Sequence, residues 1–183
     1  MAKLIIMKGL PGCGKSTKAQ EIFKANGNCV RLNKDLIREM LHFNQPHKPN
    51  YVFKGRQEDE VRKAQRELAI YFIKQNKNVI IDDTNLNPKT LNSWVELARQ
   101  SGISYEVVDM TDVDVITCVM RDNERMAKGE RFVGGIVIKN MAIQWGLVTF
   151  KPDNVVICDI DGTLADNKHR NHFVANGKKM DYW

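Results

Sequence analysis

The chain has 183 residues, of which 43% are hydrophobic and 27% are charged, and its formal net charge is +6. This length is enough for one good hydrophobic core, and every apolar run is far shorter than the roughly 20 residues of a membrane helix. The first apolar run, residues 4–7, is also too short for the core of a signal peptide. The basic balance favours a polyanionic partner such as nucleic acid, although many proteins without such a partner are equally basic.

The expected elements alternate between strand and helix along the chain. Short apolar runs predict buried strands at residues 4–7, 29–32, 79–81, 104–109 and 155–158. Helical composition predicts helices at residues 16–25, 34–41, 57–75, 88–100, 112–126 and 136–145. Asn87 and Pro88 are a typical cap and first residue of a helix, and Asp112 is the expected cap of the next one. This alternation predicts an α/β fold, with a parallel sheet covered by helices on both faces.

The four cysteines, at positions 13, 29, 118 and 158, are widely spaced. This spacing excludes a CxxC pair of the kind that binds zinc or performs redox chemistry. We therefore expect free thiols in a reducing compartment and a cytoplasmic protein with no membrane association.

A phosphate-binding motif follows the first predicted strand. Residues 9–17 read GLPGCGKST, which fits G-x-x-x-x-G-K-[ST] and opens the first predicted helix. In such a loop the backbone N–H groups bind phosphate oxygens at a helix N-terminus. The motif predicts ATP as ligand and Mg²⁺ as cofactor, whereas the alternative is a glycine-rich turn that binds no nucleotide. The predicted ATP ligands of the loop are Gly9, Gly12, Gly14, Lys15, Ser16 and Thr17, and Ser16 is also a predicted Mg²⁺ ligand.

Two further segments follow the second and third predicted strands. Asp35, in NKDLIR, lies where a carboxylate can accept the proton of an attacking hydroxyl, and Arg38 lies one helical turn later. The alternative is that Asp35 only caps the helix and Arg38 is solvated. Asp82 and Asp83 close the third strand, where an acidic residue organises Mg²⁺ in P-loop enzymes, and only one of the two can face the site.

A group of basic residues lies on and after the helix predicted at residues 112–126. Arg121 and Arg125 are four residues apart and share a helical face, and Arg131 follows in a stretch that ends with Gly134 and Gly135. Positioned arginines stabilise the charge that develops in phosphoryl transfer, and glycines allow a lid to move. The alternative is a solvated basic helix end, which the helix dipole favours in any protein.

The segments GLPGCGKST, NKDLIR and DTNLNP (residues 83–88) resemble, in order, spacing and residue type, the 5′-kinase domain of phage polynucleotide kinase–phosphatases over roughly residues 3–145. The resemblance implies a P-loop kinase fold in which Asp35 is the general base. It also implies that Arg38 binds the acceptor's phosphate. Lys15 and Arg125 would be catalytic, with Arg125 as the catalytic arginine. Arg121 and Arg131 would contact ATP phosphates. Asp83, Thr84 and Asn85 would shape the acceptor site, with Asp83 as the second Mg²⁺ ligand.

Residues near the second predicted helix combine basic and aromatic side chains. The basic ones are His42, His47, Lys48, Lys54 and Arg56, and the aromatic ones are Phe43, Tyr51 and Phe53. Such a mixture is typical of single-strand binding through phosphate contacts and base stacking. An ordinary surface loop that packs on its own aromatics is an equally good interpretation.

A second motif, DIDGTL, follows the strand predicted at residues 155–158 and resembles the first motif of haloacid-dehalogenase (HAD) phosphatases. The resemblance implies Asp159 as nucleophile and Asp161 as acid and base. Only about twenty residues follow the motif, against a domain of ~100. We therefore expect a kinase domain at residues 1–150, and at residues 151–183 a linker and the incomplete, inactive start of a phosphatase domain.

Together these patterns predict a polynucleotide 5′-hydroxyl kinase that transfers the γ-phosphoryl group of ATP to a DNA or RNA 5′ end. The phosphatase motif favours this prediction, because a 5′-kinase paired with a phosphatase fits the repair of nucleic-acid ends. The alternatives are a P-loop kinase of a small hydroxyl compound and a non-catalytic nucleotide-binding module. The sequence leaves the choice of DNA or RNA, the kind of end and a homo-oligomeric state open. If the chain is phage-encoded, its compartment is the host cytoplasm.

Overall fold

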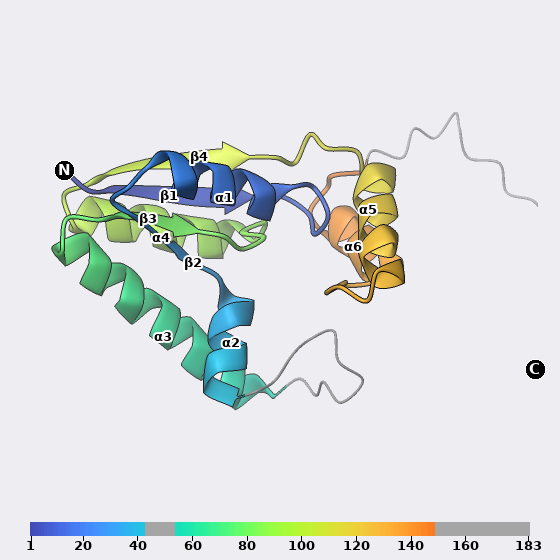
Figure 1. Ribbon diagram of the computed structural model, residues 1–183, viewed down its shortest axis with the longest axis horizontal. Coiled ribbons are helices and arrows are strands. Elements are labelled where there is room, and N and C mark those ends of the chain that lie inside the picture. Colours follow the sequence, from blue (N-terminus) through green and yellow to red (C-terminus); the bar gives the residue numbers. More distant parts are fainter. Residues whose placement is uncertain (43–53, 149–183) are drawn as a thin grey trace, which may run out of the picture. The chain divides into compact units, whose positions relative to one another are not determined.

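The computed structural model describes residues 1–42 and 54–148, and its four strands form one parallel sheet (Figure 1). The predicted strands at residues 4–7, 29–32, 79–81 and 104–109 are all present, with ends that agree within one residue. The observed strands are β1 (Lys3–Lys8), β2 (Cys29–Leu32), β3 (Asn78–Ile81) and β4 (Ser104–Asp109). The fifth predicted strand lies outside the described residues, as do Asp159 and Asp161.

Six helices separate and follow these strands in the described part of the chain. They are α1 (Lys15–Ala25), α2 (Lys34–His42), α3 (Gly55–Lys74), α4 (Pro88–Gln100), α5 (Val115–Ala127) and α6 (Gly135–Gln144). The Asn87 side chain caps α4 as predicted, accepting a hydrogen bond from the Lys89 backbone N–H at 2.9 Å. The predicted cap of α5 was wrong. Asp114, not Asp112, accepts from the Thr117 N–H at 3.0 Å, because a cap must directly precede the first helical residue.

The strand order β2-β3-β1-β4 determines where a ligand can bind. The chain leaves the central strand β1 through α1 to the edge strand β2. It leaves the other central strand, β3, through α4 to the edge strand β4. The register pairs Leu4 with Val79 and Ile6 with Ile81, which brings the ends of β1 and β3 to the same edge. A parallel sheet binds ligands at this edge, where connections depart to opposite faces.

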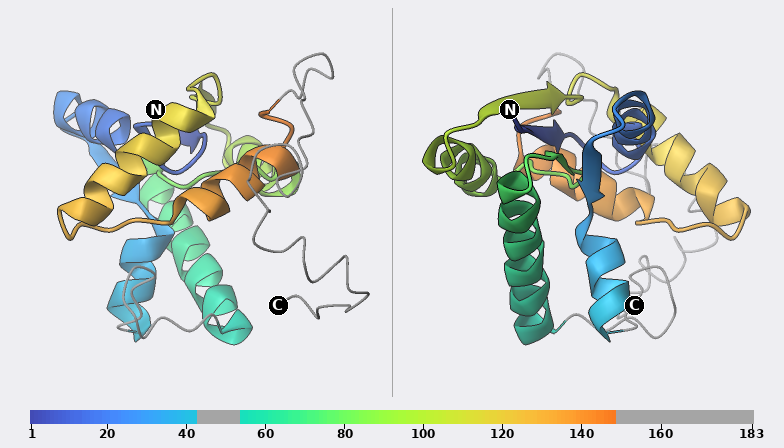
Figure 2. Two further views of the ribbon diagram at one scale, coloured as in Figure 1. Left: turned by 90° about the vertical axis from the view of Figure 1, so that its right-hand side faces the viewer. Right: turned by 60° about the vertical axis from the view of Figure 1, so that its left-hand side comes forward.

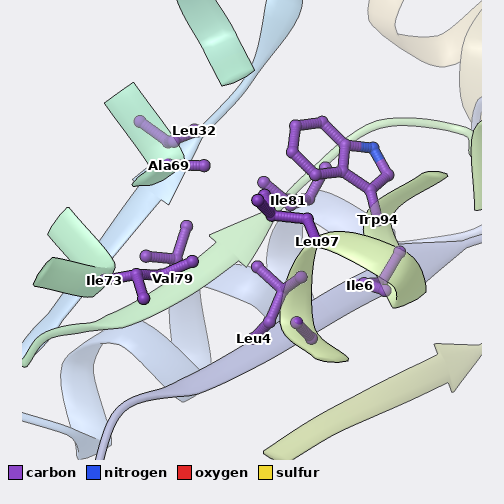
Figure 3. Packing of buried hydrophobic residues seen from close by; sticks show 10 residues of the cluster. Leu4, Ile6, Leu32, Ala69, Ile73, Val79, Ile81, Trp94 and Leu97 are labelled. Atoms are coloured by element: carbon purple, nitrogen blue, oxygen red, sulfur yellow. The ribbon is translucent and has the colours of Figure 1, made fainter. Parts of the chain in front are cut away.

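Alternation along β1 assigns its side chains to two cores. Leu4 and Ile6 point to the face covered by α3 and α4, where Trp94 and Leu97 pack against them (Figure 3). Ile5 and Met7 point to the opposite face and pack with Ala19 of α1. Helices thus cover both faces, and the central strands read as continuous apolar runs because both of their faces are buried.

Two pairs of helices lie at the carboxyl edge of the sheet. α2 lies beside the first turns of α3, and α5 packs with α6 (Figure 2). The α5–α6 pair contacts the segment after β1, since Cys118 and Ile138 share a buried cluster with Leu10 and Cys13. Among the described residues, the structure contains no helix of the length and hydropathy needed to span a membrane.

Candidate phosphoryl-transfer site

A cavity of about 610 Å³ opens at the carboxyl edge of the sheet. Its walls come from the loop after β1, the start of α2, the end of β3, and the α5–α6 pair. Most residues singled out from the sequence line it, namely Gly12, Gly14, Lys15, Ser16, Thr17, Asp35, Arg38, Asp83, Thr84, Arg121, Arg125 and Arg131. Four segments far apart in the sequence therefore converge on one hollow.

The loop after β1 has the tight backbone that close approach to phosphate requires. Gly12 has φ +85°, and a Cβ at this position would lie 2.2 Å from the Cys118 carbonyl oxygen of α5. Gly14 has φ +99° and forms the N-cap of α1 without a capping side chain. The first N–H groups of α1 are thus left free to bind an anion, as in other phosphate loops.

Lys15 is buried within this loop. Its ammonium group donates a hydrogen bond to the Leu10 carbonyl oxygen at 2.6 Å and lies 3.6 Å from Cys13 Sγ. Burial lowers the pKa of Lys15, and the charges of Cys13 and Asp82 act in the opposite direction. The Lys15 ammonium nitrogen therefore lies at the centre of the loop, bound by the backbone that would surround a phosphate.

The two adjacent aspartates after β3 point in different directions. Asp82 Oδ1 lies 3.4 Å from the Ser16 hydroxyl, and Arg31 of β2 donates to Oδ2 at 2.8 Å through Nε and at 2.5 Å through Nη2. The residues expected from the sequence to bind Mg²⁺ are Ser16 and Asp83. The structure instead places Asp82 beside Ser16, because successive residues of an extended segment point to opposite sides.

Asp83 faces the α2–α3 side of the cavity. Its carboxylate accepts hydrogen bonds from the Lys34 backbone N–H at 3.1 Å and from Gln65 Nε2 at 2.7 Å. Burial raises the pKa of Asp83, which the Lys34 charge and these hydrogen bonds partly offset. Asp83 therefore ties the start of α2 to α3 and the end of β3.

Asp35 and Arg38 lie together on α2, as their spacing predicted. Arg38 donates to Asp35 through Nη1, and its other edge binds Glu58 of α3 at 2.5 Å through Nε and 2.8 Å through Nη2. The Arg38 side chain is only 8% exposed. The bond from Arg38 is the main cause that lowers the pKa of Glu58. Glu58 thus fixes the guanidinium plane whose remaining edge faces Asp35.

The basic residues of α5 and of the loop after it approach the cavity differently. Arg131 donates a hydrogen bond to Asp35 Oδ2. Arg121 Nη1 lies 3.4 Å from the Cys13 carbonyl oxygen, beside the phosphate loop. Arg125 bonds mainly within its own helix, to the Arg121 carbonyl and to Asp122, both at 3.4 Å. Arg131 is therefore the residue of this group that contacts Asp35, and the catalytic role of Arg125 stays a prediction.

Two predicted site residues support the cavity without lining it. The Gly9 N–H donates to the Thr84 carbonyl oxygen at 3.0 Å, which joins the phosphate loop to the segment after β3. Asn85 is buried and donates to the Met7 carbonyl oxygen at 2.8 Å. Asn85 thus binds the end of β1 through Nδ2, and its role in acceptor binding stays a prediction.

The sequence patterns did not identify the residues that bind and orient the side chains of the site. Gln65 follows Val61 and precedes Ala69 and Ile73 on the buried face of α3, so a polar residue in an apolar stripe was its signal. Arg31 lies inside a short, otherwise apolar strand, which also indicates a paired charge. Asp122 follows Cys118 on the buried face of α5 and gave the same kind of signal, whereas Glu58, in the first turn of α3, gave none.

The residues present fit a bound magnesium ion. Mg²⁺ prefers oxygen ligands and is usually bound by one or two carboxylates together with substrate phosphates. The Ser16 hydroxyl and the Asp82 carboxylate supply such a pair beside the phosphate loop. In the described residues no group of three or more His, Cys, Asp or Glu side chains could hold a metal by itself. A metal here would therefore depend on the nucleotide's own oxygens.

A parallel sheet with a phosphate loop after β1 and an acidic residue beside it defines a P-loop nucleotide-binding domain. The family model described as an AAA domain matches residues 4–144. The chain belongs to this family, whose match covers all the described helices and strands except Lys3, the first residue of β1.

Similar proteins agree with this class. One, named a bifunctional polynucleotide kinase/RNA ligase, comes from Autographa californica nuclear polyhedrosis virus and is 25% identical over 93% of this chain. The match covers 26% of that relative, so the chain spans about a quarter of its length. The chain's relation to a protein named as a polynucleotide kinase agrees with the resemblance seen in the sequence.

Solved structures with a similar fold include known kinase and RNA repair proteins. A chain of the Pnkp1/Rnl/Hen1 RNA repair complex superposes with a TM-score of 0.65 and 29% identity, over 79% of this chain and 44% of that one. A second structure of the Pnkp1/Rnl/Hen1 complex gives 0.55 and 31%, over 66% and 38%. The Mycobacterium tuberculosis APS kinase CysC, with AMPPNP and APS, gives 0.51 over 71% and 73% but is 18% identical, which shows the fold alone. The predicted P-loop kinase fold is confirmed.

Proposed function

We propose that the domain is a polynucleotide 5′-hydroxyl kinase, which transfers the γ-phosphoryl group of ATP to the 5′ end of a nucleic acid. The observation that carries the proposal is the contact set of Asp35. A carboxylate lies in the cavity that the phosphate loop also lines, with arginines on both of its oxygens. A domain that only binds a nucleotide has no need of such a carboxylate.

Each residue has a role that follows from its position. Lys15 and Arg121 lie at the phosphate loop and would stabilise the negative charge of the β- and γ-phosphates. Arg125, the catalytic arginine expected from the sequence, lines the same cavity and would stabilise the same charge. Asp35 would accept the proton of the attacking hydroxyl, because a carboxylate bound by two arginines still has lone pairs free. Ser16 and Asp82 would hold Mg²⁺, which supplies charge neutralisation at the phosphates.

The acceptor would lie between α2 and the loop that carries Arg131. Arg38 and Arg131 both reach Asp35, so a phosphate next to the 5′ hydroxyl would meet two guanidinium groups. Asp83 and Thr84 line the same side of the cavity and would shape it. The names of the similar proteins concern RNA ligation and RNA repair, so an RNA end is the first acceptor to test.

The proposal is tested by transfer of radiolabel from γ-labelled ATP to oligonucleotides. Four acceptors of one sequence are compared, namely RNA and DNA, each with a 5′ hydroxyl and with a 5′ phosphate. Label on the 5′-hydroxyl strands, and none on those already phosphorylated, supports the proposal. Label on a small hydroxyl compound but on no strand would favour the metabolite kinase, and ATP binding without any transfer would favour a nucleotide-binding module.

A further inference from the structure

Asp122 is a buried carboxylate to which neither the sequence motifs nor the proposed mechanism gives a role. It lies on α5 and is 1% exposed. Its two oxygens accept hydrogen bonds from the backbone N–H of Val133, both at 3.1 Å, and Oδ2 also accepts from the N–H of Gly134 at 2.7 Å. A buried carboxylate needs such donors, and these two come from a different segment of the chain, while Arg125 of α5 also donates to Oδ1 at 3.4 Å.

These bonds anchor the backbone directly in front of α6. Gly134 precedes the helix and has no side chain, so no capping bond comes from that position. The Asp122 carboxylate instead binds the N–H groups of the two residues before the helix, and a negative charge near a helix N-terminus is favourable. The two helices also approach closely, since a Cβ at Gly135 would lie 3.0 Å from Val119 Cγ1. Asp122 therefore joins α5 to the start of α6.

The segment between these two fixed points carries Arg131. It leaves α5 after Ala127 and is bound by Asp122 at Val133, two residues beyond Arg131. From there the Arg131 side chain reaches Asp35 of α2, on the other side of the cavity. A loop held at both ends restricts where its central residue can lie. Without the carboxylate, one of the two ends is released.

We propose that Asp122 is a positioning residue that acts through Arg131: it holds the α5–α6 loop so that this guanidinium stays against Asp35. The inference rests on the proposed kinase function, because the loop matters only if Arg131 acts on the substrates. A catalytic group displaced by about 1 Å costs on the order of 10²-fold in rate. We therefore expect Asp122→Ala to lower kcat about 10²-fold.

The test is a double-mutant comparison of kcat at saturating ATP and acceptor. Asp122→Ala, Arg131→Ala and the double variant are measured beside Asp114→Ala. The control removes another aspartate of the same helix, which caps α5 through the Thr117 N–H and is exposed. It thus reproduces the loss of an aspartate that accepts a backbone hydrogen bond, without touching the Arg131 loop. Asp114→Ala is expected to keep the wild-type kcat within about threefold.

The outcomes separate positioning from a general structural role. If Asp122 acts through Arg131, the double variant is no slower than Arg131→Ala alone, because there is no longer a guanidinium to position. The proposal is overturned if adding Asp122→Ala to Arg131→Ala lowers kcat by the same 10²-fold. It is also overturned if Asp122→Ala alone retains the wild-type kcat. Should Asp122→Ala not fold, Asp122→Asn serves in the same comparison, because its single carbonyl oxygen keeps part of the hydrogen bonding to Val133 and Gly134.

A readout that needs no activity separates this inference from the proposed function. Backbone hydrogen exchange at Val133 and Gly134 is expected to be slow in the wild type and in Asp114→Ala, and much faster in Asp122→Ala. Unchanged protection in Asp122→Ala would overturn the inference even if the wild type is an active kinase. A wild type that transfers no label would refute the proposed function, while the exchange result still decides whether Asp122 holds the loop.

Discussion

Arg131 donates a hydrogen bond to Asp35, although 96 positions separate the two residues in the sequence. The bond joins the loop between α5 and α6 to the start of α2, across the cavity that the phosphate loop lines. Arg38 binds the other oxygen of the same carboxylate. Asp35 is therefore the point at which the nucleotide side and the acceptor side of the proposed site meet.

The first prediction separates the two adjacent aspartates. Asp82→Asn should raise the Mg²⁺ concentration needed for half-maximal transfer, because Asp82 and not Asp83 lies beside the Ser16 hydroxyl. Asp83→Asn should leave the Mg²⁺ requirement near the wild-type value and instead raise the KM for the acceptor. Mg²⁺ titrations of the transfer rate measure both. An unchanged Mg²⁺ requirement in Asp82→Asn would return the metal role to Asp83.

The second prediction concerns the backbone of the phosphate loop. Gly12→Ala should destabilise the fold and weaken ATP binding, since its Cβ would lie 2.2 Å from the Cys118 carbonyl oxygen at a positive φ. Overpacking of this kind costs about 1–3 kcal/mol. Gly27→Ala is the matched control, as nothing lies within 4 Å of its added Cβ. Urea unfolding and ATP titration measure the pair, and equal behaviour of both variants would contradict the loop geometry.

The third prediction is a pH dependence of stability that belongs to Glu58. The Arg38 bond lowers the pKa of Glu58 below its ordinary value of 4.5. A carboxylate with a lowered pKa stabilises the folded state above its ordinary pKa, and this contribution is lost as the pH falls through the lowered value. The stability advantage of the wild type over Glu58→Gln should therefore shrink below about pH 4.5.

Urea unfolding of both proteins at a series of pH values from about 6 to about 3 measures this difference. Glu67→Gln, at an exposed position of the same helix, controls for the loss of a carboxylate as such. An advantage of the wild type over Glu58→Gln that stays constant across this range would show that the Arg38–Glu58 pair adds nothing to stability.

The fourth prediction concerns salt. If two or three acceptor phosphates are bound by basic residues, the apparent affinity for a single-stranded acceptor should fall about tenfold between about 50 and 200 mM salt. An oligonucleotide of the same sequence with neutral methylphosphonate linkages should show almost no such dependence. Equal salt dependence for the charged and neutral strands would indicate that the acceptor's phosphates are not recognised.

Much of the fold was accessible from the sequence, because its signals are local. Strands buried on both faces read as apolar runs, and the Asn87-Pro88 pair marks the start of α4. The phosphate loop combines a motif with the strand and helix that it needs on either side. Even here, the cap of α5 was misplaced by two positions, since Asp112 and Asp114 look alike to a composition argument.

The orientation of side chains within the site could not be predicted in the same way. Whether Asp82 or Asp83 faces Ser16 depends on how β3 ends against β2, where Arg31 binds one of them. That Arg131 rather than Arg125 reaches Asp35 depends on the path of a loop that Asp122 holds. Such contacts join elements distant in sequence, and spacing along one element carries no information about them.

The most direct test of the account compares wild type with Asp35→Asn in single-turnover transfer of γ-labelled phosphate to a 5′-hydroxyl oligonucleotide. The account predicts that the wild type labels the 5′ end, whereas Asp35→Asn is slower by at least about 10²-fold, the usual contribution of a general base. ATP affinity should be the same in both, because Asp35 lies on the acceptor side. Transfer at the wild-type rate by Asp35→Asn, or a wild type that binds ATP and labels no 5′ hydroxyl, would contradict it.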